Sequence, residues 1–133
     1  MFDYFRETIE AYKGQKHVRG KVDCNLLVLK LFDLDNHEKM FGRYTTIRGG
    51  VRVSRKVYGV SSIYEYLQKN EDFREVPKGF QRPFDVIAFK DTHNVYVCLG
   101  KYWFGVGEDD IFSFVSPSNY KKEDYVVYRK ELN

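Results

Sequence analysis

One cysteine stands where a thiol can become a nucleophile. Asp23, a residue type that often precedes the first turn of a helix, comes directly before Cys24, and an apolar run follows to Phe32. Unpaired N–H groups and the dipole at a helix start stabilise a thiolate, the reactive form in cysteine catalysis. Cys24 is therefore a candidate nucleophile. The simpler interpretation is a small side chain buried in the core.

Nucleophilic chemistry at Cys24 also requires a base, and the chain has three histidines. His37 falls in a charged run and is expected to be solvated, while His17 has no evident partner. His93 opens the segment 93–100, in which residues 95–99 are mainly β-branched and aromatic, as is typical of a strand. If that strand packs against the cysteine helix, the His93 imidazole comes within reach of the thiol. The alternative is a polar residue at a strand end.

Neither the other cysteine nor the histidines indicate a metal site, a cofactor or a disulfide framework. Cys98 lies between Val97 and Leu99, so we expect it to pack in the core. No Cys or His pair has the close spacing typical of a metal site, and we expect no cofactor. The first twelve residues lack the apolar run of a secretory signal, and no window is long enough for a membrane span.

Helical patterns that could position Cys24 fill the first half of the chain. The run after Asp23 predicts a helix buried on most sides, although a buried strand would fit the same residues. Segments 15–22 and 33–40 are expected to be loops. Four helices are expected: Phe2–Tyr12 with Phe2, Phe5, Ile9 and Tyr12 on one face and a stop at Gly14, Cys24–Phe32, 47–58 ending at Gly59, and a short helix capped by Ser61 or Ser62 that includes Ile63, Tyr64 and Leu67.

Strand patterns dominate after Pro77. The apolar runs 85–89, 95–99, 102–106, 111–115 and 125–128 are separated by Gly-, Pro- and Asn-containing segments. Helices followed by strands predict an α+β fold, with N-terminal helices packed on a C-terminal antiparallel β-sheet. No linker or repeat divides the sequence, so we expect one domain over residues 1–133.

The composition restricts the function classes. An apolar fraction of 43% with 17% aromatic residues excludes a disordered chain, and a net charge of +3 is too small to indicate nucleic-acid binding by itself. Basic residues nevertheless gather in one segment, as Arg43, Arg48, Arg52, Arg55 and Lys56. We interpret them as a solvated helix face, and docking to an acidic partner or a phosphate backbone is the alternative.

Three segments, in this order, resemble the NlpC-type superfamily of papain-like cysteine peptidases. Asp23-Cys24 begins the buried helix, as Asp-Cys does in that family. Residues 83–89 are similar to its Gly-Asp-Leu-Val-Phe-Phe strand, with Phe84 where Gly is usual, and residues 94–100 are similar to its His-Val-Gly-Ile-Tyr-Leu-Gly strand. Segment 41–46 and the basic segment after it resemble a narrower subgroup that is common in phage genomes, near virion and tail genes.

The resemblance implies a papain-like NlpC-type fold in which Cys24 attacks, His93 is base and acid, and main-chain N–H groups near Cys24 form the oxyanion hole. A gapless alignment places the family histidine on Asn94. That shift of one residue turns a strand side chain to the other face, unless a bulge restores it. Asn25 replaces the usual Ser.

The third polar residue of the family falls near Val106, which is apolar. A carboxylate could replace it only if the following loop folds back, and the candidates are Glu108, Asp109 and Asp110.

The resemblance implies a virion- or tail-associated protein, made in the host cytoplasm, that hydrolyses peptide stems of the bacterial cell wall. The alternative is a catalytically inactive structural or adaptor protein that binds neighbouring subunits of the phage particle, through the basic segment and exposed aromatic residues. Nucleic-acid binding would rest on the basic segment alone, and we do not expect it.

Overall fold

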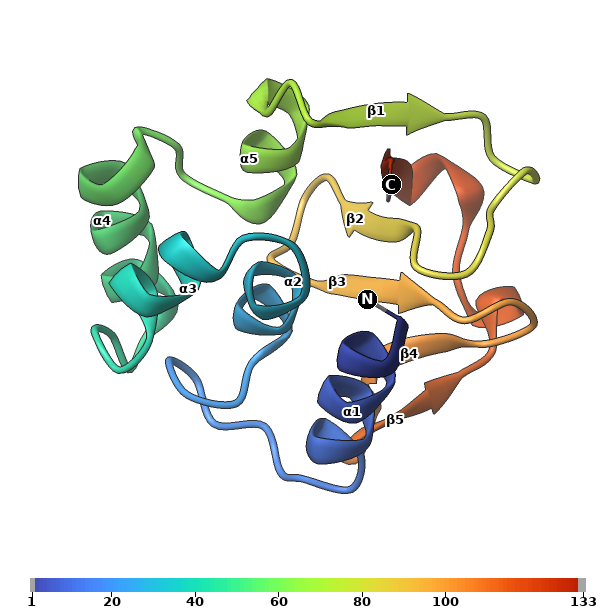
Figure 1. The fold of residues 1–133 in the computed structure, drawn as a ribbon, viewed down its shortest axis with the longest axis horizontal. Helices are drawn as coiled ribbons and strands as arrows, with labels where there is room; N and C mark the ends of the chain where they lie inside the picture. The colour runs from blue at the N-terminus through green and yellow to red at the C-terminus, as the bar shows by residue number, and fades with distance from the viewer. Residues whose placement is uncertain (1, 132–133) are drawn as a thin grey trace.

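Helices come first and strands second in the computed structural model of the chain, which describes residues 2–131 without the side chain of Phe2 (Figure 1). The helices are α1 (Phe2–Tyr12), α2 (Cys24–Phe32), α3 (Leu34–Met40), α4 (Ile47–Tyr58) and α5 (Ile63–Lys69). The strands are β1 (Phe73–Val76), β2 (Val86–Phe89), β3 (Val95–Cys98), β4 (Trp103–Val106), β5 (Phe112–Val115) and β6 (Tyr125–Lys130), with short 3₁₀ turns η1 (Pro117–Asn119) and η2 (Lys122–Asp124). The expected α+β class is confirmed.

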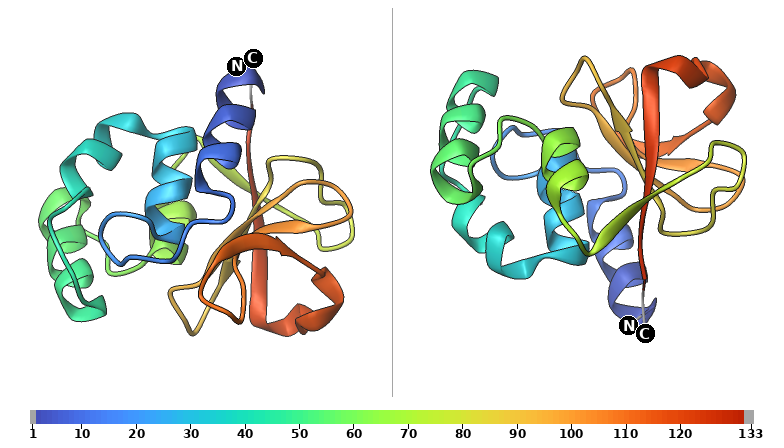
Figure 2. Two further views of the ribbon diagram at one scale, coloured as in Figure 1. Left: turned by 90° about the horizontal axis from the view of Figure 1, so that it is seen from below. Right: turned by 90° about the horizontal axis from the view of Figure 1, so that it is seen from above.

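The strands form one antiparallel sheet in the order β1-β6-β2-β3-β4-β5. Strands β2 to β5 follow one another as a meander, and β6 returns to pair with both β1 and β2. The helices lie together on one side of the sheet (Figure 2). An aromatic cluster that includes Trp103 and Tyr125 covers the opposite face, and Cys98 packs there, 1% exposed, as the sequence predicts for a core residue.

Helix α2 forms where the capped apolar run predicts it. The Asp23 side chain accepts a hydrogen bond from the Leu26 main-chain N–H, which satisfies one of the unpaired donors at the helix start. Seven of its nine residues are buried. Its first turn meets the segment before β3, since the Cys24 thiol donates a hydrogen bond to the His93 carbonyl.

Two elements differ from the expectation. Segment 33–40 is not a loop, because the Asp33 side chain caps α3 by accepting from the Asn36 N–H. His37 is consequently buried against Phe41 instead of solvated. Strand β1 was not expected, since its two central residues are polar and exposed, and it forms because its main chain pairs with β6. The expected burial of three residues of α1, Phe5, Ile9 and Tyr12, is confirmed, while the side chain of Phe2 lies outside the described residues.

The other boundaries shift by a residue or two. The expected first strand begins at Val86, and Asp85 stands just before it in a buried ion pair with Arg129. Helices α4 and α5 are capped by Thr46 and Ser62, and α4 ends at Gly59 as expected. No helix in the described part of the chain has the length and apolar character to cross a membrane.

Candidate functional site

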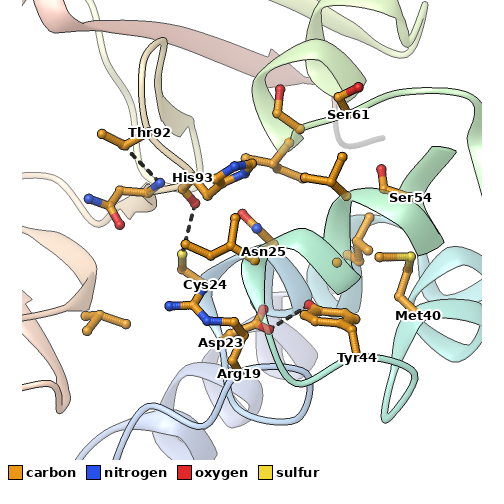
Figure 3. A pocket seen from close by; sticks show the side chains of 18 of the residues that line it. Arg19, Asp23, Cys24, Asn25, Met40, Tyr44, Ser54, Ser61, Thr92 and His93 are labelled. Carbon is orange, nitrogen blue, oxygen red and sulfur yellow. Dashed lines mark hydrogen bonds between the residues drawn. The ribbon is translucent and has the colours of Figure 1, made fainter.

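A cleft of about 450 Å³ lies where the start of α2, the segment before β3 and helix α4 meet (Figure 3). This volume is within the range of roughly 300–1,000 Å³ that is usual for small-molecule and cofactor sites. The residues that line it include Arg19, Cys24, Asn25, Tyr44 and His93. All three residues that the sequence places in the site, Cys24, His93 and the alternative Asn94, thus line the same cleft.

The buried carboxylate of Asp23 connects segments that meet at the cleft. Asp23 is 3% exposed, and its oxygens accept from the Leu26 N–H (2.8 Å), the Gly20 N–H (2.7 Å) and the Tyr44 hydroxyl (2.6 Å). Gly20 has φ +88°, and a Cβ there would lie 1.9 Å from the Tyr44 carbonyl oxygen, so only glycine fits. These contacts cap α2 and connect two other segments, the loop at Gly20 and the segment of Tyr44, to its start.

The cleft also shows why segment 41–46 matters. Tyr44 comes from this segment, and its hydroxyl reaches Asp23 across 21 positions of sequence. Burial first and the Asp23 charge second raise the Tyr44 pKa, so the hydroxyl stays protonated and donates. Sequence reasoning missed this role. The only signal was that segment 41–46 resembled part of a phage-associated subgroup.

Cys24 is held as a neutral thiol. Its Sγ donates to the main-chain oxygen of His93 at 3.5 Å. Burial and the neighbouring Asp23 charge raise the pKa of the thiol to about 12, against the favourable effects of the Val95 and Cys24 N–H groups and of Arg19. The helix start therefore does not produce a thiolate here, because desolvation outweighs the dipole.

The His93 imidazole does not contact the thiol. It lies on the far side of its own main chain from the sulfur and faces the cleft (Figure 3). Burial, followed by the positive charge of Arg19, lowers the pKa of His93, so the ring is neutral at pH 7. Strand β3 begins only at Val95, so strand alternation does not set the direction of either His93 or Asn94. Asn94 is exposed at the edge of the cleft.

No carboxylate orients the His93 ring among the residues that the structure describes. Val106, near which the resemblance to NlpC-type peptidases places a third polar residue, lines the cleft and offers only its carbonyl, which accepts from the Tyr96 hydroxyl. The following loop does bring Asp110 to the cleft, but its carboxylate pairs with His17 at 3.3 Å. This His17–Asp110 pair was not foreseen, because 93 residues separate its partners.

Two further side chains in the cleft have no hydrogen-bond or ion-pair partner within the described part of the chain. Arg19 forms no hydrogen bond or ion pair with any residue from 2 to 131, although its charge acts on both Cys24 and His93. The buried Oδ1 of Asn25 accepts no hydrogen bond. Arg19 lies in a basic loop segment where nothing in the sequence distinguishes it from Lys16 or Lys21. Over residues 2–131, no group of three or more His, Cys, Asp or Glu side chains is placed to hold a metal ion.

A family model described as "Domain of unknown function (DUF6950)" matches residues 3–122. The chain belongs to this family. The match to DUF6950 runs from α1 to the first residue of η2, so it contains every cleft residue described above and excludes only β6 among the strands. No curated protein shows significant similarity to the chain.

Proposed function

We propose that this DUF6950 chain is a phage virion- or tail-associated protein with an NlpC-like, papain-type fold, whose Cys24 cleft binds peptide without cleaving it. It would be made in the host cytoplasm and carried in the particle. The fold assignment is supported by the Asp23-capped helix that meets β3 beside a cleft, which is the arrangement that the sequence resemblance implies.

The single observation that carries the proposal is the hydrogen bond from the Cys24 thiol to the His93 carbonyl. A cysteine peptidase requires the thiol to pass its proton to an imidazole. Here the proton is directed to a main-chain oxygen, and the ring faces away (Figure 3). With a pKa of about 12, roughly one molecule in 10⁵ carries a thiolate at pH 7. The site is thus better suited to binding than to attack.

The second candidate is a cysteine peptidase of cell-wall peptide stems. It is favoured by the presence of Cys24 and His93 in the same cleft, and by the Val95 and Cys24 N–H groups that favour a thiolate. A rotation of the His93 side chain on substrate binding would be needed to bring the ring to the sulfur, and no second group fixes the ring in that position.

Incubation with intact peptidoglycan decides between the two candidates. We expect the purified protein to be retained by insoluble peptidoglycan without releasing new peptides detectable by mass spectrometry. Cleavage that is lost in Cys24→Ala and kept in Cys98→Ala would establish the peptidase. Mass spectrometry of purified phage particles checks the location, where we expect a fixed copy number. Absence from particles would overturn the virion assignment.

A further inference from the structure

Two unsatisfied groups of opposite hydrogen-bonding character face the same cleft. The Arg19 guanidinium is half-buried, offers only donors and carries a positive charge that no carboxylate of residues 2–131 neutralises by contact. The Asn25 Oδ1 is buried, acts only as an acceptor and receives no hydrogen bond from residues 2–131. Figure 3 places both beside the Cys24 sulfur, Arg19 on one side and the Asn25 amide on another. A buried acceptor without a partner is costly, so a ligand that supplies a donor is favoured.

The neighbouring carboxylates do not serve as partners for Arg19. Asp23 is the closest in sequence, and its two oxygens already accept three hydrogen bonds. Asp110 is paired with His17, and Asp91 is exposed at the edge of the cleft. The guanidinium therefore keeps its five donors for an anion, and a planar carboxylate matches their geometry in two parallel hydrogen bonds.

We propose that the cleft recognises the free C-terminal carboxylate of a peptide. Arg19 binds the carboxylate, and Asn25 Oδ1 accepts the amide N–H of the terminal residue. In a C-terminal residue the amide nitrogen, which carries the N–H donor, is two bonds from the carboxylate carbon. One residue therefore satisfies both side chains at once. The dianion of a phosphate monoester has no O–H or N–H donor on its phosphate group for Asn25, so it fits the pair less well. The inference rests on the proposed function, because it takes the cleft to be a peptide-binding site.

The test compares three short peptides of the same length. N-acetyl-Ala-Ala has a free C-terminal carboxylate, its C-terminal amide has none, and N-acetyl-Ala-Asp-amide has only a side-chain carboxylate. Binding is followed by titration calorimetry and by NMR shifts of the Cys24 and Asn25 main-chain amides. We expect the free acid to bind at least about tenfold more tightly than the other two, since a charge-assisted pair at Arg19 is made only there.

The variants identify the residues responsible. Arg19→Gln should reduce the acid-to-amide affinity ratio to about one, and Arg19→Lys should retain part of it, because a point charge remains without the planar fork. Asn25→Leu should weaken the acid and the amide alike, since both supply the same N–H. Arg52→Gln is the matched control, because Arg52 is an exposed arginine on α4 that does not line the cleft. It should leave the ratio unchanged. Near-ultraviolet circular dichroism checks that each variant is folded.

Each other outcome overturns the inference. Equal binding of acid and amide at the cleft amides would refute carboxylate recognition while leaving a peptide-binding cleft intact. Equal binding of the Asp-containing amide would assign the site to side-chain carboxylates instead of chain ends. A preference that survives Arg19→Gln would remove the role of Arg19. If no peptide shifts the Cys24 and Asn25 amides, the inference and the peptide-binding function fail together.

Discussion

Raising the pH from 7 to 11 should increase the rate at which iodoacetamide alkylates Cys24 by about tenfold per pH unit, without a plateau. Only the thiolate reacts, and the Cys24 pKa of about 12 keeps its population proportional to hydroxide over this whole interval. At pH 7 the thiolate fraction is roughly 10⁻⁵, against about 10⁻² for a thiol with the ordinary value of 9.0. The rate should therefore be about a thousandfold below that of a free thiol.

The assay is pulsed alkylation followed by peptide mass spectrometry, which reports Cys24 and Cys98 separately. Cys98 is the internal control, because it is 1% exposed and lies on the opposite face of the sheet from the cleft. Modification of Cys98 reports opening of the fold. If Cys24 reacts faster than Cys98 and low urea does not accelerate it, the reaction proceeds in the folded protein.

The result that would refute this reasoning is an inflection in the Cys24 profile between pH 4 and 8, with a rate at pH 7 equal to or above that of free cysteine. Such a profile is that of a catalytic thiolate paired with an imidazolium. It would show that burial does not determine the pKa of the Cys24 thiol, and the peptidase would become the better proposal.

The same pKa shift has a consequence for stability. The folded protein holds the Cys24 proton more tightly than the unfolded chain does. The protonated thiol therefore contributes to the free energy of unfolding in full below pH 9, and this contribution is lost as the pH rises toward 12. The free energy of unfolding should fall by about 1.4 kcal/mol per pH unit in this window through Cys24 alone. Urea titrations of the wild type and Cys24→Ala at pH 8 and 10 measure the difference, which a flat profile would contradict.

Substitutions at three positions test interactions that stabilise the fold, each measured by urea unfolding. Asp85→Asn should cost about 3–5 kcal/mol, because Arg129 would stay buried without its bidentate carboxylate partner, and a loss under 1 kcal/mol would contradict this. Tyr44→Phe should cost about 2 kcal/mol by removing a hydrogen bond to the buried Asp23, with Tyr102→Phe, an exposed tyrosine, as a neutral control. Phe84→Gly should be more stable than Phe84→Ala by about 1 kcal/mol, because φ at this position is +74°, and the reverse order would refute the strain.

Phe84 stands where the strand motif that residues 83–89 resemble has Gly, and its backbone conformation is one that favours Gly. The backbone of Phe84 adopts a left-handed conformation, which glycine accepts without strain. The Phe84 ring packs edge-on against Phe5 at 5.0 Å between centroids, and this contact offsets part of the strain. Residue 84 therefore has a left-handed backbone conformation although it is not a glycine.

The sequence by itself determined the elements whose signals are local. A cap at Asp23 followed by an apolar run predicted α2, and apolar runs separated by segments that contain Gly, Pro and Asn predicted five of the strands. Capping and turn signals of this kind act within a few residues. The same signals predicted that Cys24 heads a buried helix and that Cys98 lies in the core. Strand β1 and helix α3 were missed, since one depends on pairing with β6 and the other on a second Asp cap within an otherwise polar segment.

Only the tertiary structure decided the chemistry of the cleft. A cap and a dipole favour a thiolate, but the surrounding core desolvates Cys24 and raises its pKa, and desolvation depends on every element packed around the sulfur. The direction of the His93 ring and the pairing of His17 with Asp110 depend on how separate loops meet. Arg19 and Asn25 became candidates for the same reason, because a missing partner can be recognised only when all the neighbours of a side chain are known.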